Sequence, residues 1–292
     1  MTRWAGAALR SFVWAAIAAT GAAAAHDAAH EEAPALNGPV AGTPVAGTPV
    51  AGTPVAGTPV AASAPVMELQ QVAANVFFVQ GVSALGSAAN RNFISNAGFV
   101  ITADSVVVID ALGSPALAEE LVQKIRTLTP KPISHVLLTH YHADHIYGLQ
   151  VFEALGAKIV AHAQAREYIN SETAHLRLEA SRKDLAPWVD QGTRLVPANQ
   201  WVSGDSSTLK VGGVDFVLQH MGPSHTPEDT AIFLPQSGVL FIGDVVFRNR
   251  IPYVGQADSR HWIAALDELL KLPVKVMVPG HGPASEQPRQ DM

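Results

Sequence analysis

The 292-residue sequence contains no cysteine. Disulfide bonds, thiolate nucleophiles and metal sites that need a cysteine ligand are therefore excluded. The chain also lacks an excess of positive charge, with 25 acidic against 19 basic residues, so nucleic acid is not an expected partner. Hydrophobic residues make up 48% of the sequence, which is enough for a sizeable core in one large domain or two small ones.

The first 25 residues have the organisation of a secretory signal peptide. Arg3 and Arg10 form a cationic head, residues 12–19 form an apolar core too short to span a bilayer, and residues 23–25 are small, as cleavage requires. No twin-arginine pair is present, which favours export of the unfolded chain. We therefore expect a periplasmic or secreted protein with no transmembrane span after cleavage. An uncleaved membrane anchor is the alternative.

The segment that follows, residues 26–66, is expected to be a disordered linker. Within it, residues 39–58 repeat Pro-Val-Ala-Gly-Thr four times without error. A five-residue period with one proline and one glycine fits neither a helix nor a sheet, and it offers no large side chain to a core. The repeat is either a spacer between the membrane exit point and the domain or a product of repeat slippage with no selected role.

A globular domain is expected over residues 67–283, with a short tail at residues 284–292. Short β-branched runs predict strands at residues 69–72, 76–79, 93–94, 99–101, 106–109, 133–139, 158–161, 201–202, 208–211, 214–220, 231–234, 239–242 and 274–278. Apolar residues at helical spacing predict helices at residues 115–128 after the cap Ser114, from near Asp144, over about 164–185, and from a cap at Asp258 or Ser259 to about 270.

The strands come in two batches, each accompanied by helices of its own. This order predicts an α+β fold in which two sheets pack face to face with helices outside, an αβ/βα four-layer sandwich. Residues 82–91 are small and polar and predict a mobile loop, a candidate flap over a site. The tail is short and broken by proline, so no final helix is expected there.

The densest group of chemical side chains lies at residues 140–145, which read His-Tyr-His-Ala-Asp-His. His140 and His142 can point the same way if the loop is extended, whereas Asp144 and His145 diverge by about a hundred degrees once a helix has begun. One short segment could therefore serve two neighbouring metal ions. Imidazole nitrogen and carboxylate oxygen are ligands of zinc, iron and manganese. A polar loop with clustered histidines is the alternative.

Three more candidate ligands follow predicted strands. His225, Asp244 and His281 each stand just after an apolar run, in Ser-His-Thr-Pro, Gly-Asp and Pro-Gly-His-Gly respectively. Each alone is typical of a turn or an exposed loop. Together with residues 140–145 they predict strand ends that converge at one edge of the sandwich, where seven donors suit two metal ions that share one carboxylate.

The order of these motifs resembles the metallo-β-lactamase superfamily over residues 67–283. The resemblance implies the sandwich fold and a dinuclear centre at its edge, with two zinc ions, or iron or manganese in their place. It assigns the donors to a first metal (His140, His142, His225), a second metal (Asp144, His145, His281) and a bridging position (Asp244). Asp110 stands where this family often has an acid that orients a ligand; a turn residue is the alternative.

The function that this site implies is hydrolysis of a small molecule. Two metal ions lower the pKa of a bridging water, and the resulting hydroxide would attack an ester, thioester, lactone or amide (lactam) bond, or a phosphoester, with Asp144 as the catalytic residue that orients it. Two subclasses of β-lactamase have cysteine where Asp244 stands. The complete donor set is more similar to that of glyoxalase II-type enzymes, although the glutathione-binding extension of those enzymes is absent. In the residues around its motifs, the sequence looks most like exported zinc hydrolases associated with quinoprotein or sulfur-oxidation gene clusters.

Two other functions remain open at this point. One is an iron-dependent oxidoreductase on the same scaffold, similar to the persulfide dioxygenases, and the other is a non-catalytic, metal-binding exported protein. Three residues that follow Asp244 are expected to border the substrate pocket, namely Arg248, Arg250 and Tyr253. Five other histidines are expected to be structural or solvated: His135, His162, His175, His220 and His261. The residues do not specify an oligomeric state.

Overall fold

The computed structural model describes residues 65–292, which begin just before the predicted domain. The predicted signal peptide and all but the last two residues of the predicted linker lie outside these described residues. Within them, no helix combines the length and the apolar character needed to cross a bilayer.

The first sheet has seven strands in the order of the sequence, β1-β2-β3-β4-β5-β6-β7. The first four are antiparallel neighbours, and β4 to β7 run parallel. The strands are β1 (Leu69–Ala73), β2 (Val76–Val79), β3 (Ala97–Ile101), β4 (Val106–Ile109), β5 (Ile133–Leu137), β6 (Lys158–His162) and β7 (Gln200–Val202). Parallel strands need long connections, and here the connections after β4, β5 and β6 contain the helices α1 to α5.

The second sheet has five strands in the order β12-β11-β10-β9-β8. All its pairs are antiparallel except β11 with β12. The strands are β8 (Ser206–Val211), β9 (Val214–His220), β10 (Thr230–Leu234), β11 (Val239–Phe247) and β12 (Val276–His281). Gly212 and Gly213, both at positive φ, turn β8 into β9, as the paired glycines predict.

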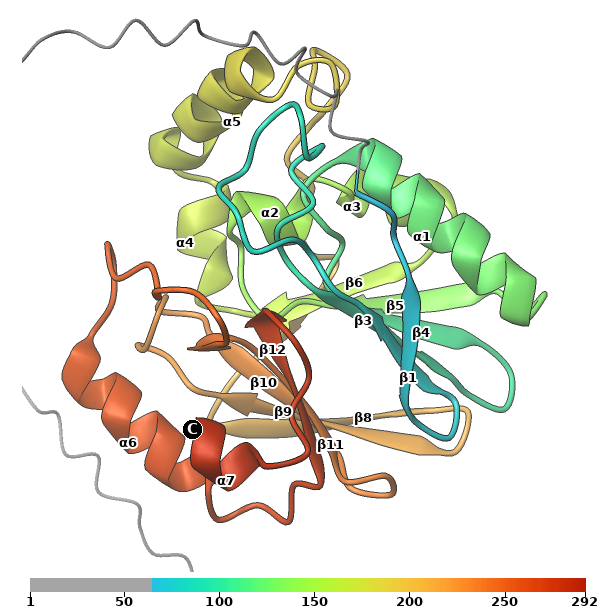
Figure 1. Cartoon of the computed structure of the whole chain (residues 1–292), viewed down its shortest axis with the longest axis vertical. Helices are drawn as coiled ribbons and strands as arrows, with labels where there is room; N and C mark the ends of the chain where they lie inside the picture. The colour runs from blue at the N-terminus through green and yellow to red at the C-terminus, as the bar shows by residue number, and fades with distance from the viewer. Residues whose placement is uncertain (1–64) are drawn as a thin grey trace, which may run out of the picture. The chain divides into compact units, whose positions relative to one another are not determined.

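Alternating side chains of the strands build three apolar layers. In β4, Val106 and Val108 pack toward helices, whereas Val107 and Ile109 pack toward the second sheet. All four are buried, which explains why this strand is apolar throughout. Figure 1 shows the outcome: α1 (Pro115–Leu128) and its neighbours lie outside one sheet, and α6 (Ser259–Leu269) lies outside the other. The predicted α+β four-layer sandwich is confirmed.

Capping and the spacing of apolar residues account for α1. Ser114 accepts a hydrogen bond from the Leu117 amide at 3.4 Å, and Pro115 occupies the first helical position, where its missing N–H costs nothing. Leu117, Leu121 and Ile125 are buried in one stripe against the first sheet. The predicted helix over 115–128 is therefore confirmed.

Three predicted elements differ in the structure. Residues 93–94 are not a strand, because Arg91 and Asn92 adopt left-handed conformations and turn the chain. The predicted helix over 164–185 is two helices, α4 (Ala165–Ile169) and α5 (Glu172–Asp184), because Ser171 caps the second one by accepting from the Ala174 amide at 3.2 Å.

The helix expected from near Asp144 is also divided, into α2 (Ala143–Ile146) and α3 (Leu149–Ala154). Gly148 lies between them and packs so closely on the backbone of Ala111 that an added Cβ would lie 2.0 Å from its carbonyl oxygen. This contact anchors the turn of α2, which carries Asp144 and His145, onto the end of the first sheet.

The expectation of a tail without a helix is wrong. Residues Pro288–Asp291 form one helical turn, α7, with Pro288 at its first position, where proline does not interrupt a helix. Arg248 holds this turn by an ion pair with Asp291 at 3.2 Å and by donating to the carbonyl of Ala284 at 2.7 Å. Met292 packs on the apolar layer beneath α6.

Candidate metal centre

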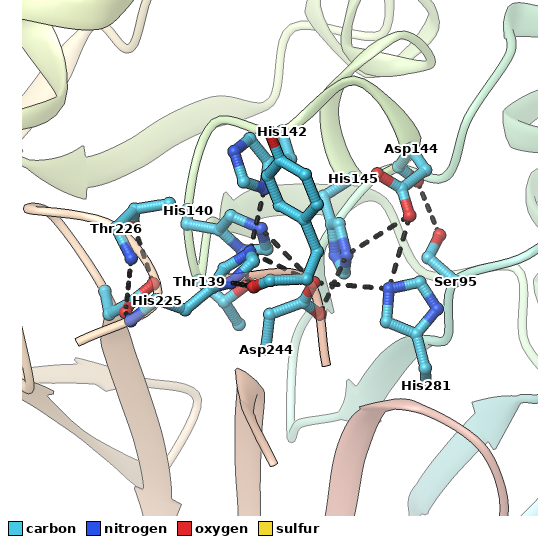
Figure 2. A network of polar contacts seen from close by, with 12 residues as sticks. Ser95, Thr139, His140, His142, Asp144, His145, His225, Thr226, Asp244 and His281 are labelled. Carbon is cyan, nitrogen blue, oxygen red and sulfur yellow. Dashed lines mark hydrogen bonds and ion pairs between the residues drawn. The ribbon is translucent and has the colours of Figure 1, made fainter. Parts of the chain in front are cut away.

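The edge where both sheets end carries all seven predicted ligands, which the structure brings into two adjacent groups (Figure 2). His140 and His142 lie on the extended chain between β5 and α2, and His142 is the residue that precedes the helix. Asp144 and His145 lie within the single turn of α2. The change from extended chain to helix separates the two pairs, as the sequence predicts.

The first group contains His140, His142, His225 and Asp244, each offering a donor atom within 4.8 Å of the others. Asp244 Oδ2 lies 3.3 Å from His225 Nε2 and 3.7 Å from His140 Nε2. His142 presents Nδ1 instead, 2.9 Å from His225 Nε2. All four residues are buried.

The second group contains Asp144, His145 and His281, again within 4.8 Å of one another. His281 Nε2 lies 3.3 Å from Asp144 Oδ2 and 3.2 Å from Asp244 Oδ2, while His145 Nε2 lies 3.2 Å from Asp244 Oδ1. Asp244 therefore faces donors of both groups, the geometry expected of a bridging carboxylate.

Three of these atoms show that the residues fit metal ions. His140 Nε2, His145 Nε2 and Asp244 Oδ1 are buried without a hydrogen-bond partner. Unpartnered polar atoms in a protein interior are costly and uncommon. A cation among them would accept each lone pair, and imidazole nitrogen with carboxylate oxygen is a donor set of zinc, iron or manganese.

The rings of the cluster differ in pKa: nearby carboxylates, chiefly Asp244, outweigh burial and raise the pKa of His145 and His281, whereas two other rings show the opposite shift. Burial lowers the pKa of His140 well below its usual range and that of His142 to about 4, so both rings are neutral near neutral pH and keep a free lone pair. Burial alone would raise the pKa of Asp244, but the nearby His281, His145 and His140 outweigh it and hold that pKa well below its usual range. Asp244 is therefore a carboxylate.

Hydrogen bonds behind the rings orient four of the five imidazoles. Each places its Nδ1 against an oxygen: His140 against Thr139 Oγ1 at 3.0 Å, His145 against Asp110 Oδ2 at 2.9 Å, His225 against the Tyr253 carbonyl at 2.9 Å and His281 against the Ile94 carbonyl at 2.7 Å. A ring that donates from Nδ1 directs the lone pair of Nε2 into the centre. Residue 94, wrongly predicted in a strand, thus supplies its carbonyl to the site.

Asp110 is more than the turn residue that the sequence left open. Its carboxylate accepts from the Thr139 amide at 2.9 Å, from Thr139 Oγ1 at 2.8 Å and from His145 Nδ1. Its backbone has φ of 58°, a conformation that non-glycine residues adopt rarely and often at functional sites. Asp110, at the end of β4, therefore contacts both Thr139, which precedes His140, and His145.

Replacing Asp110 by asparagine should lower metal affinity by about 10- to 100-fold, because the amide removes the charge that orients His145 and presents an N–H where only acceptors fit. Competition with a chromogenic chelator measures this change. Asp267→Asn, an exposed position on α6, is the matched control. Unchanged affinity in Asp110→Asn would mean that this carboxylate only stabilises the turn.

Asp244 does not follow its strand, as the sequence suggested, but lies inside β11. The register between β11 and β12 shifts around Gly243, whose φ is 56°. Gly280 on β12 faces Asp244 so closely that an added Cβ would lie 2.0 Å from Oδ1. The bulge at Gly243 and the absence of a side chain at Gly280 together allow the Asp244 carboxylate to reach the other donors from within paired strands.

Several supporting residues were not predicted. Asp229 accepts from the amides of His225 and Thr226 at 2.6 and 2.8 Å and from Thr226 Oγ1 at 2.7 Å, which fixes the loop that carries His225. Asn96 donates to the carbonyls of Pro279 and Gly282 at 2.8 Å on either side of His281. The acid four residues after His225 is a detectable signal, whereas nothing near Asn96 in the sequence points to His281.

The three residues expected at the pocket border have different positions. Tyr253 borders the site, with its ring 6.0 Å from that of His142, and Arg250 Nη1 lies 3.0 Å from His281 Nδ1. Arg248 instead binds the C-terminal turn, as described above.

The loop over residues 82–91, predicted as a flap, is tied to its neighbours by two hydrogen bonds. Ser83 Oγ donates to the Asn249 carbonyl at 3.0 Å, and Trp188 Nε1 donates to the Ala88 carbonyl at 2.8 Å.

None of the other five histidines joins either donor group among the described residues. His162 and His220 stack with ring centroids 3.8 Å apart, His135 bonds Ser134 Oγ at 2.9 Å, and His175 and His261 bond within their own helices or caps.

Residues 90–281 match the family described as the metallo-β-lactamase superfamily. The chain therefore belongs to this superfamily, as its motifs predict. Curated relatives include the alpha subunit of a 2,4-dinitroanisole O-demethylase from Nocardioides sp., 27% identical over 60% of this chain and 49% of its own length. A type 2 metallo-β-lactamase from Bacillus sp. is 26% identical over 68% of this chain and 71% of its own length. A linear primary-alkylsulfatase from Pseudomonas sp. is 23% identical, and the match spans 40% of it.

Solved structures agree with the fold. A metallo-β-lactamase from Pontibacter korlensis aligns with a TM-score of 0.58 and 25% identity, covering 76% of this chain and 94% of that one. A sec-alkylsulfatase from Pseudomonas sp. aligns with a TM-score of 0.59 and 21% identity, covering 77% of this chain and 39% of that one. The second likeness concerns the sandwich fold alone. The chain spans half or less of the O-demethylase subunit and of the linear primary-alkylsulfatase.

Proposed function

We propose that this protein is an exported hydrolase of a small molecule and that it works with two metal ions, zinc in the first instance. The observation that supports this most strongly is the position of Asp244, whose two oxygens face donors of both groups. A site for one ion, as in the iron-dependent alternative, would leave one group of donors without a function. The proposed ligands are those assigned from the sequence: His140, His142 and His225 to the first ion, Asp144, His145 and His281 to the second, and Asp244 to both.

When bound, such a pair of ions supplies a water of lowered pKa as nucleophile and a Lewis acid for the bond under attack. The chain supplies orientation. Asp144 is the only one of the seven donors that is partly exposed, and it borders a cavity of about 320 Å³. Its carboxylate is therefore placed to orient the attacking water and to accept its proton, while its backbone carbonyl is held by Ser95 Oγ at 2.5 Å.

The bond that is cleaved is proposed from the chemistry of the site, as an ester, thioester, lactone or amide. The names of the relatives refer to an aryl methyl ether, an alkyl sulfate and β-lactams. These reactions differ in their leaving groups, so likeness to any one of them does not specify a substrate.

The test is a panel assay of the zinc-loaded chain with nitrocefin, S-lactoylglutathione, aryl esters and an alkyl sulfate. We expect turnover of at least one compound, its loss on chelation, and its return when two equivalents of zinc are added. Turnover that survives complete removal of metal would contradict the proposal, and so would inactivity across the panel of a chain that holds two ions. Iron in the purified protein together with oxygen consumption would favour the oxidoreductase.

A further inference from the structure

The donor cluster opens on a second, larger cavity on the side of His142. This cavity has a volume of about 580 Å³, the size of a small-molecule binding site, and His142 forms part of its wall. One side of it is formed by α4 and the start of α5, including Glu167 and Tyr168, and the other by the loop after β9 and by the segment before α6, including Glu228 and Gln256. Figure 1 shows α4 beside the segment that joins β11 to α6.

The charged side chains that line this cavity have one sign. Glu167 and Glu228 are both acidic, and no lysine or arginine is among the lining residues within residues 65–292. Arg166, the neighbour of Glu167 on α4, does not change this, because its guanidinium lies over the Trp201 ring at 4.8 Å from the ring centroid. Glu167 is exposed to solvent, whereas Glu228 is buried in the wall and burial raises its pKa, so the exposed negative charge is that of Glu167.

An aromatic side chain adds a second feature with the same preference. Tyr168 is half-buried in the cavity wall, and its ring lies 6.4 Å from the ring of His142, nearly perpendicular to it. The face of a tyrosine ring attracts cations, and most strongly when the cation is partly desolvated. A cation in this cavity would meet Tyr168 and Glu167 on adjacent positions of one helix, next to a proposed ligand of the first metal.

The smaller cavity beside Asp144 has a basic residue in its lining as well as acids. The cavity of about 320 Å³ that Asp144 borders is lined by two acids, Asp144 and Asp184, and by one basic residue, Arg177. The cavity beside His142 therefore differs from the smaller one in having no lysine or arginine among the described residues that line it.

We propose that the cavity beside His142 is a specificity subsite for a compact, positively charged group of the substrate, of the size of a trimethylammonium group, and that it disfavours carboxylates and sulfonates. The proposal rests on the proposed hydrolase function and names its substrate class: esters or related compounds that carry an ammonium group on the acyl side. Glu167 and Tyr168 are the residues that determine this specificity.

Three 4-nitrophenyl esters of one chain length test the subsite. They carry 4-(trimethylammonio)butanoate, its neutral isostere 5,5-dimethylhexanoate, or the anionic 4-sulfobutanoate, and none has an acyl-chain amine that could cyclise. A unit charge several ångströms from a surface acid interacts with that acid by about a few times the thermal energy. We therefore expect kcat/KM for the cationic ester to exceed kcat/KM for the anionic ester by about 10-fold or more. Equal values, or a preference for the sulfonate, would overturn the proposal.

Variants separate the subsite from catalysis. Glu167→Gln should reduce the cation-to-anion ratio by about 3- to 10-fold, and Glu167→Lys should reverse the preference, both with little change for the neutral ester. Glu119→Gln, at an exposed acid on α1 outside this cavity, is the matched control and should change nothing. A ratio that stays unchanged in both Glu167 variants would refute the role of this residue.

A binding measurement keeps the proposal testable if no ester is hydrolysed. Titration of the isotope-labelled, metal-loaded chain with butyltrimethylammonium and with butanesulfonate is followed through the amide signals of α4. Shifts with the cation only, weakened in Glu167→Gln, would support the subsite even though the hydrolase proposal had failed. No shift, or equal shifts with the anion, would overturn it.

Discussion

Replacement of Asp244 by asparagine is expected to lower the metal content below two ions per chain and to reduce kcat/KM by about 1,000-fold or more. Asp244 is the one residue whose oxygens lie near donors of both groups, at 3.2 Å from His145 Nε2 and from His281 Nε2 and at 3.3 Å from His225 Nε2. The amide keeps the size of the side chain but removes its charge. Each 1.4 kcal/mol of lost transition-state stabilisation lowers the rate about tenfold. A loss of several kcal/mol at the metal centre therefore gives a reduction of about this size.

The control for this variant is Asp215→Asn. Asp215 forms an ion pair with the exposed Lys210 at 2.7 Å, at the far end of the second sheet's outer hairpin, and exposed pairs contribute little to stability. Metal content and rate should stay at their original values. An Asp244→Asn protein that holds two ions and keeps full activity would contradict a shared carboxylate.

Removal of the metal ions should lower the melting temperature by about 10 °C. The atoms His140 Nε2, His145 Nε2 and Asp244 Oδ1 are buried without a hydrogen-bond partner, so the folded state gains when ions bind and the unfolded chain has no such site. At a free metal concentration about 1,000 times Kd, binding contributes about 4 kcal/mol, and a domain of this size shifts by about 2–4 °C per kcal/mol.

Scanning calorimetry of the zinc-loaded and the chelated protein measures this shift. The same comparison in Asp244→Asn should give a much smaller difference, which separates the loss of the site from effects of the chelator on the rest of the chain. Superimposable melting curves for the loaded and chelated original protein would show that the cluster does not destabilise the folded protein when metal is removed.

Much of the sandwich could be predicted because its local signals and its tertiary structure agree. The strands Val76–Val79, Val106–Ile109 and Val214–His220 have the bounds that their apolar runs predict. The residue that caps α1, Ser114, is the one chosen from its position before a proline. In these segments the residue pattern, the cap and the buried face all favour the same element.

The differences occur where the backbone serves the site. Residues 93–94 read as a strand, but Arg91 and Asn92 turn the chain so that the Ile94 carbonyl reaches His281. Asp244 reads as a turn after a strand, yet β11 continues through it because a bulge at Gly243 redirects the side chain. Neither feature has a local signal, because each depends on a partner more than thirty positions away in the chain, as the Asn96 contacts around His281 also do.

The proximity of the seven donors could be predicted as a whole, but their individual geometry could not. Strand ends that share one edge of a sandwich must meet, which is why four separate motifs indicated one site. That His142 presents Nδ1 while His140 and His225 present Nε2 depends on what lies behind each ring. Those partners, such as the Tyr253 carbonyl, come from segments that carry no recognisable motif.

The most direct test of a shared dinuclear centre is metal analysis of the purified chain by mass spectrometry, after dialysis against metal-free buffer and with protein concentration from amino-acid analysis. The structure predicts two ions per chain, falling to one or fewer in Asp244→Asn and remaining at two in Asp215→Asn. One equivalent of iron, or a chain that retains no metal, would contradict it.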